Sequence, residues 1–150
     1  MPEAVAEAVT AVALPKIVVV LAAGLAPGAA ANIAACLAAG LTAARPGWAG
    51  QSLVDAAGLA SAASSHLPIT ILRADPDPMR SLLAQLAAAA SEPDSVVSLF
   101  PAYAQAMHGC EAYWQRHRET AHAEEPMLGI GLHGPKRWVT RLTGSLPLWR

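Results

Sequence analysis

Three short runs of apolar, largely β-branched residues alternate with helix-like segments, and this alternation limits the folds open to the chain. The runs are KIVVVL at 16–21, ITILRA at 69–74 and SVVSLF at 95–100. Uniformly apolar strands are typical of a sheet that is covered on both faces. Each run precedes a turn and a segment with helical spacing. This order predicts an α/β domain with a largely parallel or mixed sheet.

Further helices and strands complete the predicted order. Helices are expected at 29–43, from Asp77-Pro78 to Ala90, after Pro101 and at 135–142. MLGIGL at 127–132 is predicted as a fourth strand, SLVD at 52–55 as a brief pairing segment, and LPLWR at 146–150 as a small fifth strand. These elements together indicate one sheet with helices on both faces.

Two local patterns refine the expected helices. Asp77 is predicted as an N-cap, with Pro78 in the first helical position. The helix after Pro101 is expected to be amphipathic, with an apolar stripe typical of a core face. The stripe consists of Tyr103, Met107, Cys110 and Trp114.

The length of the chain, 150 residues, matches one domain. We expect residues 1–15 to form an arm or a short helix, and residues 16–150 to form a single α/β domain. No internal repeat and no second core are visible in the sequence.

A long uncharged run at 17–44 raises the question of a membrane span, because it is long enough to cross a bilayer. Gly24, Pro27 and Gly28 divide the run, so we expect a strand, a turn and a buried helix. Met1–Leu14 contains no basic residue, which a secretory leader would need. We therefore expect a cytoplasmic protein without a membrane partner.

The glycines Gly129, Gly131 and Gly134 have the spacing of a dinucleotide-binding loop, G-x-G-x-x-G. Only 16 residues follow Gly134, which leaves almost no room for the second strand of that motif. No Asp or Glu follows Glu125 to bind a ribose, and Pro135 removes a backbone amide. We therefore interpret Gly129 and Gly131 as strand residues that mark the close approach of another backbone, and HGPKR at 133–137 as a strand end, a turn and a helix start.

Composition also excludes several partner classes. A net charge of −1 gives no electrostatic case for binding nucleic acid. The two cysteines, Cys36 and Cys110, make no disulfide framework, and we expect buried free thiols. The histidines show no metal-binding spacing, so neither a metal nor another cofactor is expected.

Three blocks of the sequence resemble a known family. They are KIVVVLAAGLAPGAAANIAACLAAGL at 16–41, LPITILRAD at 67–75 and LGIGLHGPKRWVTRLTGSLPLWR at 128–150. Together they resemble the uncharacterised bacterial family called domain of unknown function two thousand, which is similar in fold to type II peptidyl-tRNA hydrolases. The resemblance implies a three-layer α/β/α sandwich around a mixed, mainly four-stranded sheet.

The resemblance does not carry over the hydrolase reaction, because the residues of that reaction are missing here. Those enzymes have a Gly-Lys-Gly-Lys stretch followed by Ala-Ala-Gln, where this chain has GAAANIAAC at 28–36. Asn32 stands in place of the second lysine and Cys36 in place of the glutamine, with one residue inserted. An Asp-Ala-Gly segment is also absent from SLFPAYAQAM at 98–107. A neutral Asn cannot replace a cation that faces an oxyanion or a phosphate.

The leading functional hypothesis is a small or anionic ligand bound in a cleft near the first helix, at Gly28 and Asn32. The alternative is a structural role, in which the Asn32 side chain forms a hydrogen bond to the preceding loop or caps the first turn of the helix. His133 and Lys136 flank another helix start, where amides and cations favour an anion; the alternative is a solvated lysine beside a histidine that ends a strand.

Two further functions stay open. One is an ester hydrolase that uses His66, with Ser64 or Ser65 and with Asp55 as the orienting acid; peptidyl-tRNA is the less favoured substrate. The other is a homo-oligomeric interaction module without a ligand. A homodimer fits the high apolar content, although nothing in the sequence determines the oligomeric state.

Overall fold

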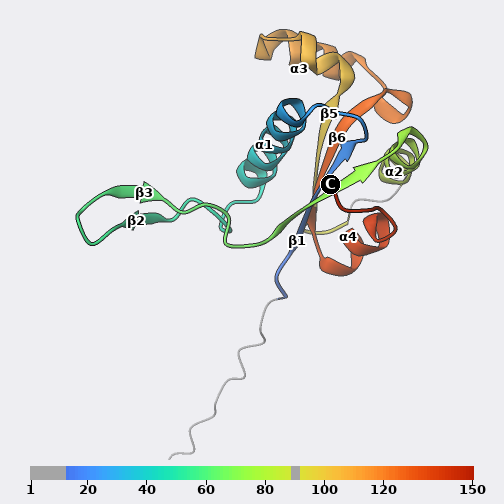
Figure 1. Ribbon diagram of the computed structural model, residues 1–150. Helices are drawn as coiled ribbons and strands as arrows, with labels where there is room; N and C mark the ends of the chain where they lie inside the picture. Colours follow the sequence, from blue (N-terminus) through green and yellow to red (C-terminus); the bar gives the residue numbers. More distant parts are fainter. Residues whose placement is uncertain (1–12, 89–91) are drawn as a thin grey trace, which may run out of the picture.

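The computed structural model describes residues 13–88 and 92–150. Its centre is a four-stranded mixed sheet in the order β4-β1-β6-β5 (Figure 1). The strands are β1 (Lys16–Ala22), β4 (Ile69–Ala74), β5 (Val96–Pro101) and β6 (Met127–Gly134). β1 and β4 are parallel, and β6 runs antiparallel to both β1 and β5. The predicted mixed α/β class and its four main strands are confirmed.

Helices cover both faces of this sheet, as the uniformly apolar strands predict. α1 (Pro27–Ala44) packs with Ile33 and Leu37 against Val19 and Leu21. α2 (Pro76–Ala88) and α4 (Lys136–Thr143) pack on the opposite face, where Val18 and Val20 point. Figure 1 shows α1 apart from α2 and α4, with the sheet between them. Because successive strand side chains point to opposite faces, β1 contributes to both cores.

The glycines of the G-x-G-x-x-G motif lie inside β6. A Cβ atom on Gly129 would stand 2.8 Å from Leu37 Cδ1 and 2.9 Å from Ile33 Cγ2, and one on Gly131 would stand 3.1 Å from Leu41 Cδ1. These glycines therefore make room for α1, which confirms their place in a strand. The expected neighbour was another backbone, and that part was wrong, since side chains of α1 approach instead.

α2 begins two residues earlier than the sequence analysis predicts. Its first residue is Pro76, and the Met79 amide donates to the Asp75 carbonyl oxygen over 3.0 Å. Asp77 is therefore a residue of the first turn and not the N-cap. Both Asp-Pro pairs satisfy the same rule, because proline fits the first position of a helix. The predicted end at Ala90 lies outside the described residues.

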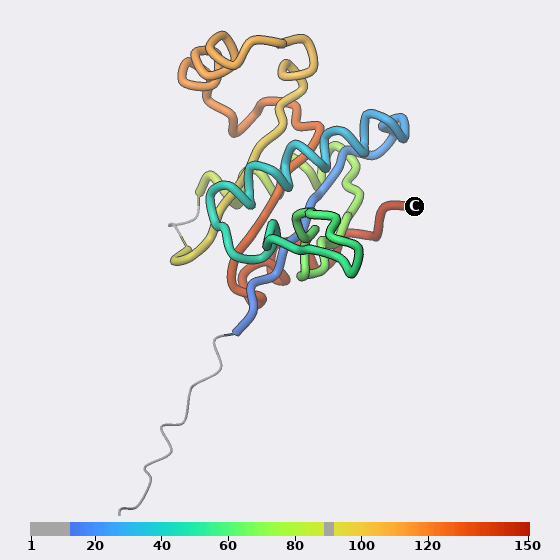
Figure 2. Tube along the Cα trace, turned by 90° about the vertical axis from the view of Figure 1, so that its left-hand side faces the viewer, coloured from blue at the N-terminus to red at the C-terminus, as the bar shows by residue number. Residues whose placement is uncertain are grey.

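The segment after β5 differs most from its prediction. A short 3-10 helix, η1 (Ala102–Ala106), is followed by an extended Met107 and then by α3 (Cys110–Glu119). No residue of α3 is buried, and Trp114 is 52% exposed. The prediction of one amphipathic core helix was wrong, because the extended Met107 separates η1 from α3 and neither helix has a buried residue. α3 stands away from the sheet and from α1 (Figure 2).

A two-stranded hairpin projects from the body of the protein (Figure 1). It consists of β2 (Ser52–Val54) and β3 (Ala60–Ala62). The Asp55 carboxylate accepts hydrogen bonds from the amides of Ala57 and Leu59, at 2.8 and 2.9 Å. These bonds, with the Leu59 amide first, lower the pKa of Asp55. The brief pairing predicted at 52–55 is confirmed.

Three smaller expectations concern the chain ends and the apolar helix. The predicted fifth strand is a single bridge between Leu72 and Leu148. The expected arm or helix at 1–15 falls mostly on residues 1–12, outside the described part. Within the described part, α1 is long and apolar enough by composition to cross a membrane. Its apolar residues Ile33, Leu37 and Leu41 are buried, as a core helix requires.

Candidate functional site

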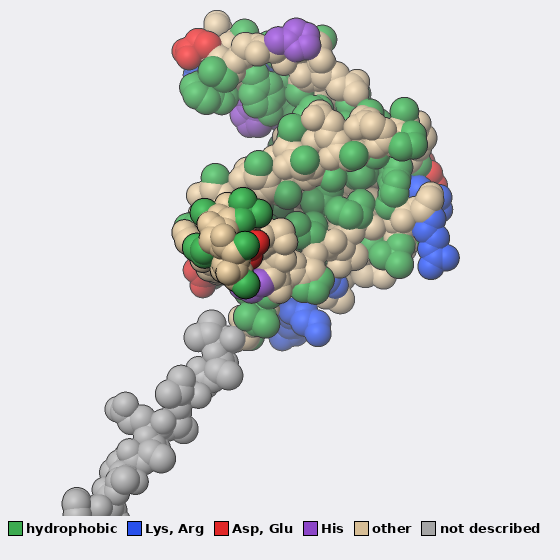
Figure 3. All heavy atoms as spheres, turned by 60° about the vertical axis from the view of Figure 1, so that its left-hand side comes forward, with side chains coloured by type: hydrophobic (Ala, Val, Ile, Leu, Met, Phe, Trp, Pro, Cys, Tyr) green, Lys and Arg blue, Asp and Glu red, His purple; other side chains and the backbone are tan. Residues whose placement is uncertain are grey.

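A groove opens between α1 and the segment formed by η1 and α3. Two adjoining cavities of about 630 and 400 Å³ make up this groove. Both are lined by Cys36 from α1, Phe100 from β5, Ala104 from η1, and Met107 and His108 from the break before α3. Figure 3 shows the molecule hollowed beneath the part that carries α3. We call this region the α1–α3 groove.

Of the residues expected near the first helix, Asn32 lies in the α1–α3 groove and Gly28 does not. The Asn32 side chain is exposed and makes no hydrogen bond to the described residues. The N-cap of α1 is Ala26, which has no side-chain capping bond. The structure thus shows no capping role for Asn32. Gly28 is an exposed residue of the first turn of α1.

The two cysteines are exposed, so the prediction of buried thiols was wrong. Cys36 and Cys110 both line the cavity of about 400 Å³, together with His108 and Tyr113. Sequence spacing held a partial signal, because Cys36 is four residues after Asn32 and shares its helix face. Nothing in the sequence placed Cys110 and His108 opposite that face, since their position depends on the break before α3.

His133 and Lys136 are not brought together with Asn32. His133 is 6% exposed, and its ring centroid lies 6.1 Å from that of Trp48, beyond the C-terminal end of α1. Lys136 is exposed at the start of α4, on the opposite face of the sheet. Trp48 packs against Leu41, which is nine residues after Asn32, or about 14 Å along a helix. Gly28 and Asn32, which are one helical turn apart on α1, therefore lie apart from His133 and from Lys136.

His133 is buried in an unusual environment for a polar residue. Its Nδ1 is the one buried side-chain polar atom without a hydrogen-bond partner in the described part of the chain. Burial lowers the pKa of His133, and the nearby positive charge of Arg45 lowers it further. The imidazole packs near Trp48, and no cavity described above reaches it.

The proposed serine, histidine and acid for a hydrolase are also apart. His66 lies at the base of the hairpin, where its amide donates to the carbonyl oxygen of Trp48. Asp55 lies at the tip and is engaged by the turn amides. Ser65 Oγ donates to the Leu67 carbonyl oxygen at 2.5 Å. The described residues show no hydrogen bond among the side chains of Ser64, Ser65, His66 and Asp55, so the structure does not assemble them for proton transfer.

An aromatic cluster ties α3 to the two segments beside it. Tyr103 Oη lies 2.7 Å from His122 Nε2, and the rings of His117 and His122 are 4.2 Å apart. Arg116 lies over the Tyr103 ring, 4.6 Å from its centroid. Burial lowers the pKa of His122, and the neighbouring His117 lowers it further. Within 13–88 and 92–150, no three His, Cys, Asp or Glu side chains group as metal ligands.

Comparison with known proteins supports the fold and supplies no activity. A solved structure of a protein of unknown function from Agrobacterium tumefaciens strain C58 is similar, with a TM-score of 0.79. The two sequences are 23% identical, over 93% of this chain and 100% of that chain, so the likeness shows a shared fold alone. No curated protein matches. A family model described as "Protein of unknown function (DUF2000)" matches residues 15–150, and the chain therefore belongs to the DUF2000 family.

Proposed function

We propose that this protein binds a small ligand in the α1–α3 groove, with Asn32 as its polar anchor. One observation supports this most: Asn32 is an exposed amide without a hydrogen-bond partner among the described residues, and it lines a cavity of about 630 Å³. By resemblance, this position corresponds to the second lysine of the Gly-Lys-Gly-Lys stretch of type II peptidyl-tRNA hydrolases. We also propose that the fold is the three-layer α/β/α sandwich of those enzymes.

The lining of the groove suggests the chemistry of the ligand. Ile33, Leu37 and Phe100 offer an apolar floor, while Asn32 and His108 offer hydrogen-bonding groups. No Lys or Arg lines either cavity of the groove. An anionic group would instead meet the free amides at the start of α3, whose N-cap Gly109 has no side chain to bond them. A ligand with an apolar body and one polar end fits these surfaces.

Replacing Asn32 by alanine is expected to weaken the ligand about three- to tenfold, the usual worth of one neutral hydrogen bond. The melting temperature without ligand should stay nearly unchanged or rise slightly, because the side chain bonds nothing in the described protein and alanine is the better helix former. The measurement is a thermal-shift screen of metabolites, followed by calorimetry on each hit with both proteins.

Ala35→Asn is the matched control, because Ala35 is an exposed α1 residue outside the groove lining. A hit should also slow the alkylation of Cys36 and Cys110 by iodoacetamide, as followed by mass spectrometry. If no metabolite shifts the wild-type melting temperature, or if hits bind Asn32→Ala equally well, the proposal is wrong.

A second candidate function, self-association, is favoured by the hairpin. Its apolar side chains Leu53, Val54 and Leu59 are 50%, 69% and 68% exposed. An isolated two-stranded hairpin is marginally stable in water, so a further contact would stabilise it. We propose that a second copy of the chain covers this hairpin, which would make the protein a homodimer.

Leu59→Glu should therefore raise the dimer dissociation constant by about 30-fold or more, the size expected for a central apolar contact. Sedimentation equilibrium measures the change. Ser52→Glu adds the same charge to the hairpin at a polar position and should have a smaller effect. A wild-type protein that sediments as a monomer at high micromolar concentration would contradict this candidate.

A further inference from the structure

A separate cavity of about 200 Å³ lies where the parallel strands β1 and β4 end. α1 follows β1 onto one face of the sheet, and α2 follows β4 onto the other face. In open α/β sheets, such a divergence creates a crevice at the carboxyl ends of the strands, where ligands bind. The cavity shares no lining residue with the α1–α3 groove.

The inner wall of this cavity is apolar. Ala22 and Ala74 line it from the strand ends, Met79 and Leu83 from α2, and Met127 from the first residue of β6. Met79, Leu83 and Met127 belong to the core between the sheet and α2. The floor is therefore fixed by packing and suits a short apolar side chain.

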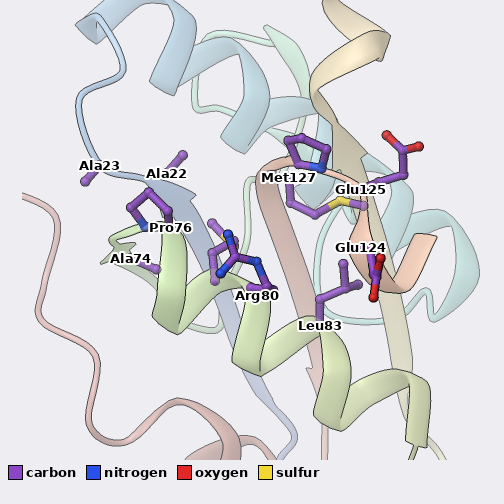
Figure 4. A pocket seen from close by; sticks show the side chains of 11 residues that line it. Ala22, Ala23, Ala74, Pro76, Arg80, Leu83, Glu124, Glu125 and Met127 are labelled. Carbon is purple, nitrogen blue, oxygen red and sulfur yellow. The ribbon is translucent and has the colours of Figure 1, made fainter.

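Charges of both signs stand around the apolar floor. Arg80 approaches from α2, and Glu124 lies across from it on the η2 turn (His122–Glu124) (Figure 4). Glu125 also lines the cavity. In the described residues, Arg80 makes one ion pair, with Asp77 at 2.8 Å, and it makes none with either glutamate. That pair is strongly exposed, so it restrains Arg80 weakly.

We propose that this cavity binds a small zwitterion with an apolar side chain, the chemistry of an apolar α-amino acid. Its carboxylate would contact Arg80, its ammonium group would contact Glu124, and its side chain would lie on Met79 and Met127. The Arg80 guanidinium and the Glu124 carboxylate line one cavity without pairing with each other, which leaves both charges for such a ligand. An anion alone would meet two glutamates, and Pro76 and Pro78 remove two amides from the start of α2.

The test compares three molecules that share the same branched apolar part and differ in which charged groups they carry. L-leucine carries both charges, 4-methylpentanoate lacks the ammonium group, and 3-methylbutylamine lacks the carboxylate. Calorimetry on the full chain should show that leucine binds about tenfold or more tightly than either analogue, because a charged hydrogen bond is lost in each case. L-alanine and L-methionine vary the apolar part under the same conditions.

Two variants assign the charges to side chains. Arg80→Gln should weaken leucine binding about tenfold or more and leave 3-methylbutylamine binding unchanged. The double variant Glu124→Gln with Glu125→Gln should also weaken leucine binding, but it should not weaken the binding of 4-methylpentanoate, which has no ammonium group. Arg73→Gln, an exposed arginine on β4 outside the cavity, is the control. The proposal is overturned if no amino acid binds at millimolar concentration. It is also overturned if leucine binds no better than its analogues, or if Arg80→Gln and Arg73→Gln behave alike.

Discussion

Gly129→Ala is expected to lower the free energy of unfolding by about 1–3 kcal/mol, the usual cost of overpacking a core. The new methyl group would stand 2.8 Å from Leu37 Cδ1 and 2.9 Å from Ile33 Cγ2. Leu37 can turn its terminal methyl group, but Ile33 Cγ2 is attached to a stiff β-branched carbon. Both side chains are buried, so α1 itself must shift away from β6. Urea denaturation followed by circular dichroism measures the loss.

Two further variants test the same contact. Gly131→Ala should cost less, because its Cβ would meet the flexible end of Leu41 at 3.1 Å. Leu37→Ala alone should cost about 2–5 kcal/mol by opening a cavity. With Gly129→Ala, the loss should be smaller than the sum, since the added methyl group occupies part of that cavity. Additive losses would show that Gly129 does not make room for α1.

The same contact shows what the sequence could predict. It predicted the strands, the main helices and the place of these glycines in a strand, but it did not predict which element packs against the glycines. Runs such as KIVVVL are apolar at every position because β1 is buried on both faces, and that pattern is visible in the sequence alone. The role of Gly129 depends on which element lies over β6. That partner is about 90 residues earlier in the chain, so periodicity within the motif cannot reveal it.

The α1–α3 groove could be predicted on one side only. Asn32 was a candidate because a lone amide in an alanine-rich helix lacks an obvious role. The opposite wall depends on the break between Ala106 and Cys110, where an extended Met107 redirects the chain. Tyr103, Met107, Cys110 and Trp114 keep helical spacing through that break, so the pattern indicated a continuous helix. Local periodicity does not report where a helix is interrupted.

The hairpin shows a related limit. Its strands are short and all their residues are exposed, so no alternation of apolar and polar residues marks them. What remains visible is the turn chemistry around Asp55, with Gly58 at a positive φ of 91°. Such signals locate a turn, but they do not state how far the hairpin projects from the sheet.

The protein should lose stability as the pH falls below about 6.5, the ordinary pKa of a histidine. Burial lowers the pKa values of His133 and His122 in the folded state. The unfolded chain therefore binds protons at a higher pH than the folded chain does. The stability is fully present above the unfolded pKa and falls with pH until the folded pKa is reached. Melting temperatures between pH 8 and pH 5 measure this slope.

His133→Leu should flatten the slope and raise the free energy of unfolding by about 1 kcal/mol at neutral pH, because it removes a buried polar atom that lacks a partner. His122→Gln should remove the second part of the slope. Met127→Leu, an uncharged change of similar volume in the buried core, should keep the wild-type slope. If His133→Leu retains the full pH dependence, the imidazole is protonated as easily in the folded protein as in the unfolded chain, and its burial against Trp48 has no electrostatic consequence.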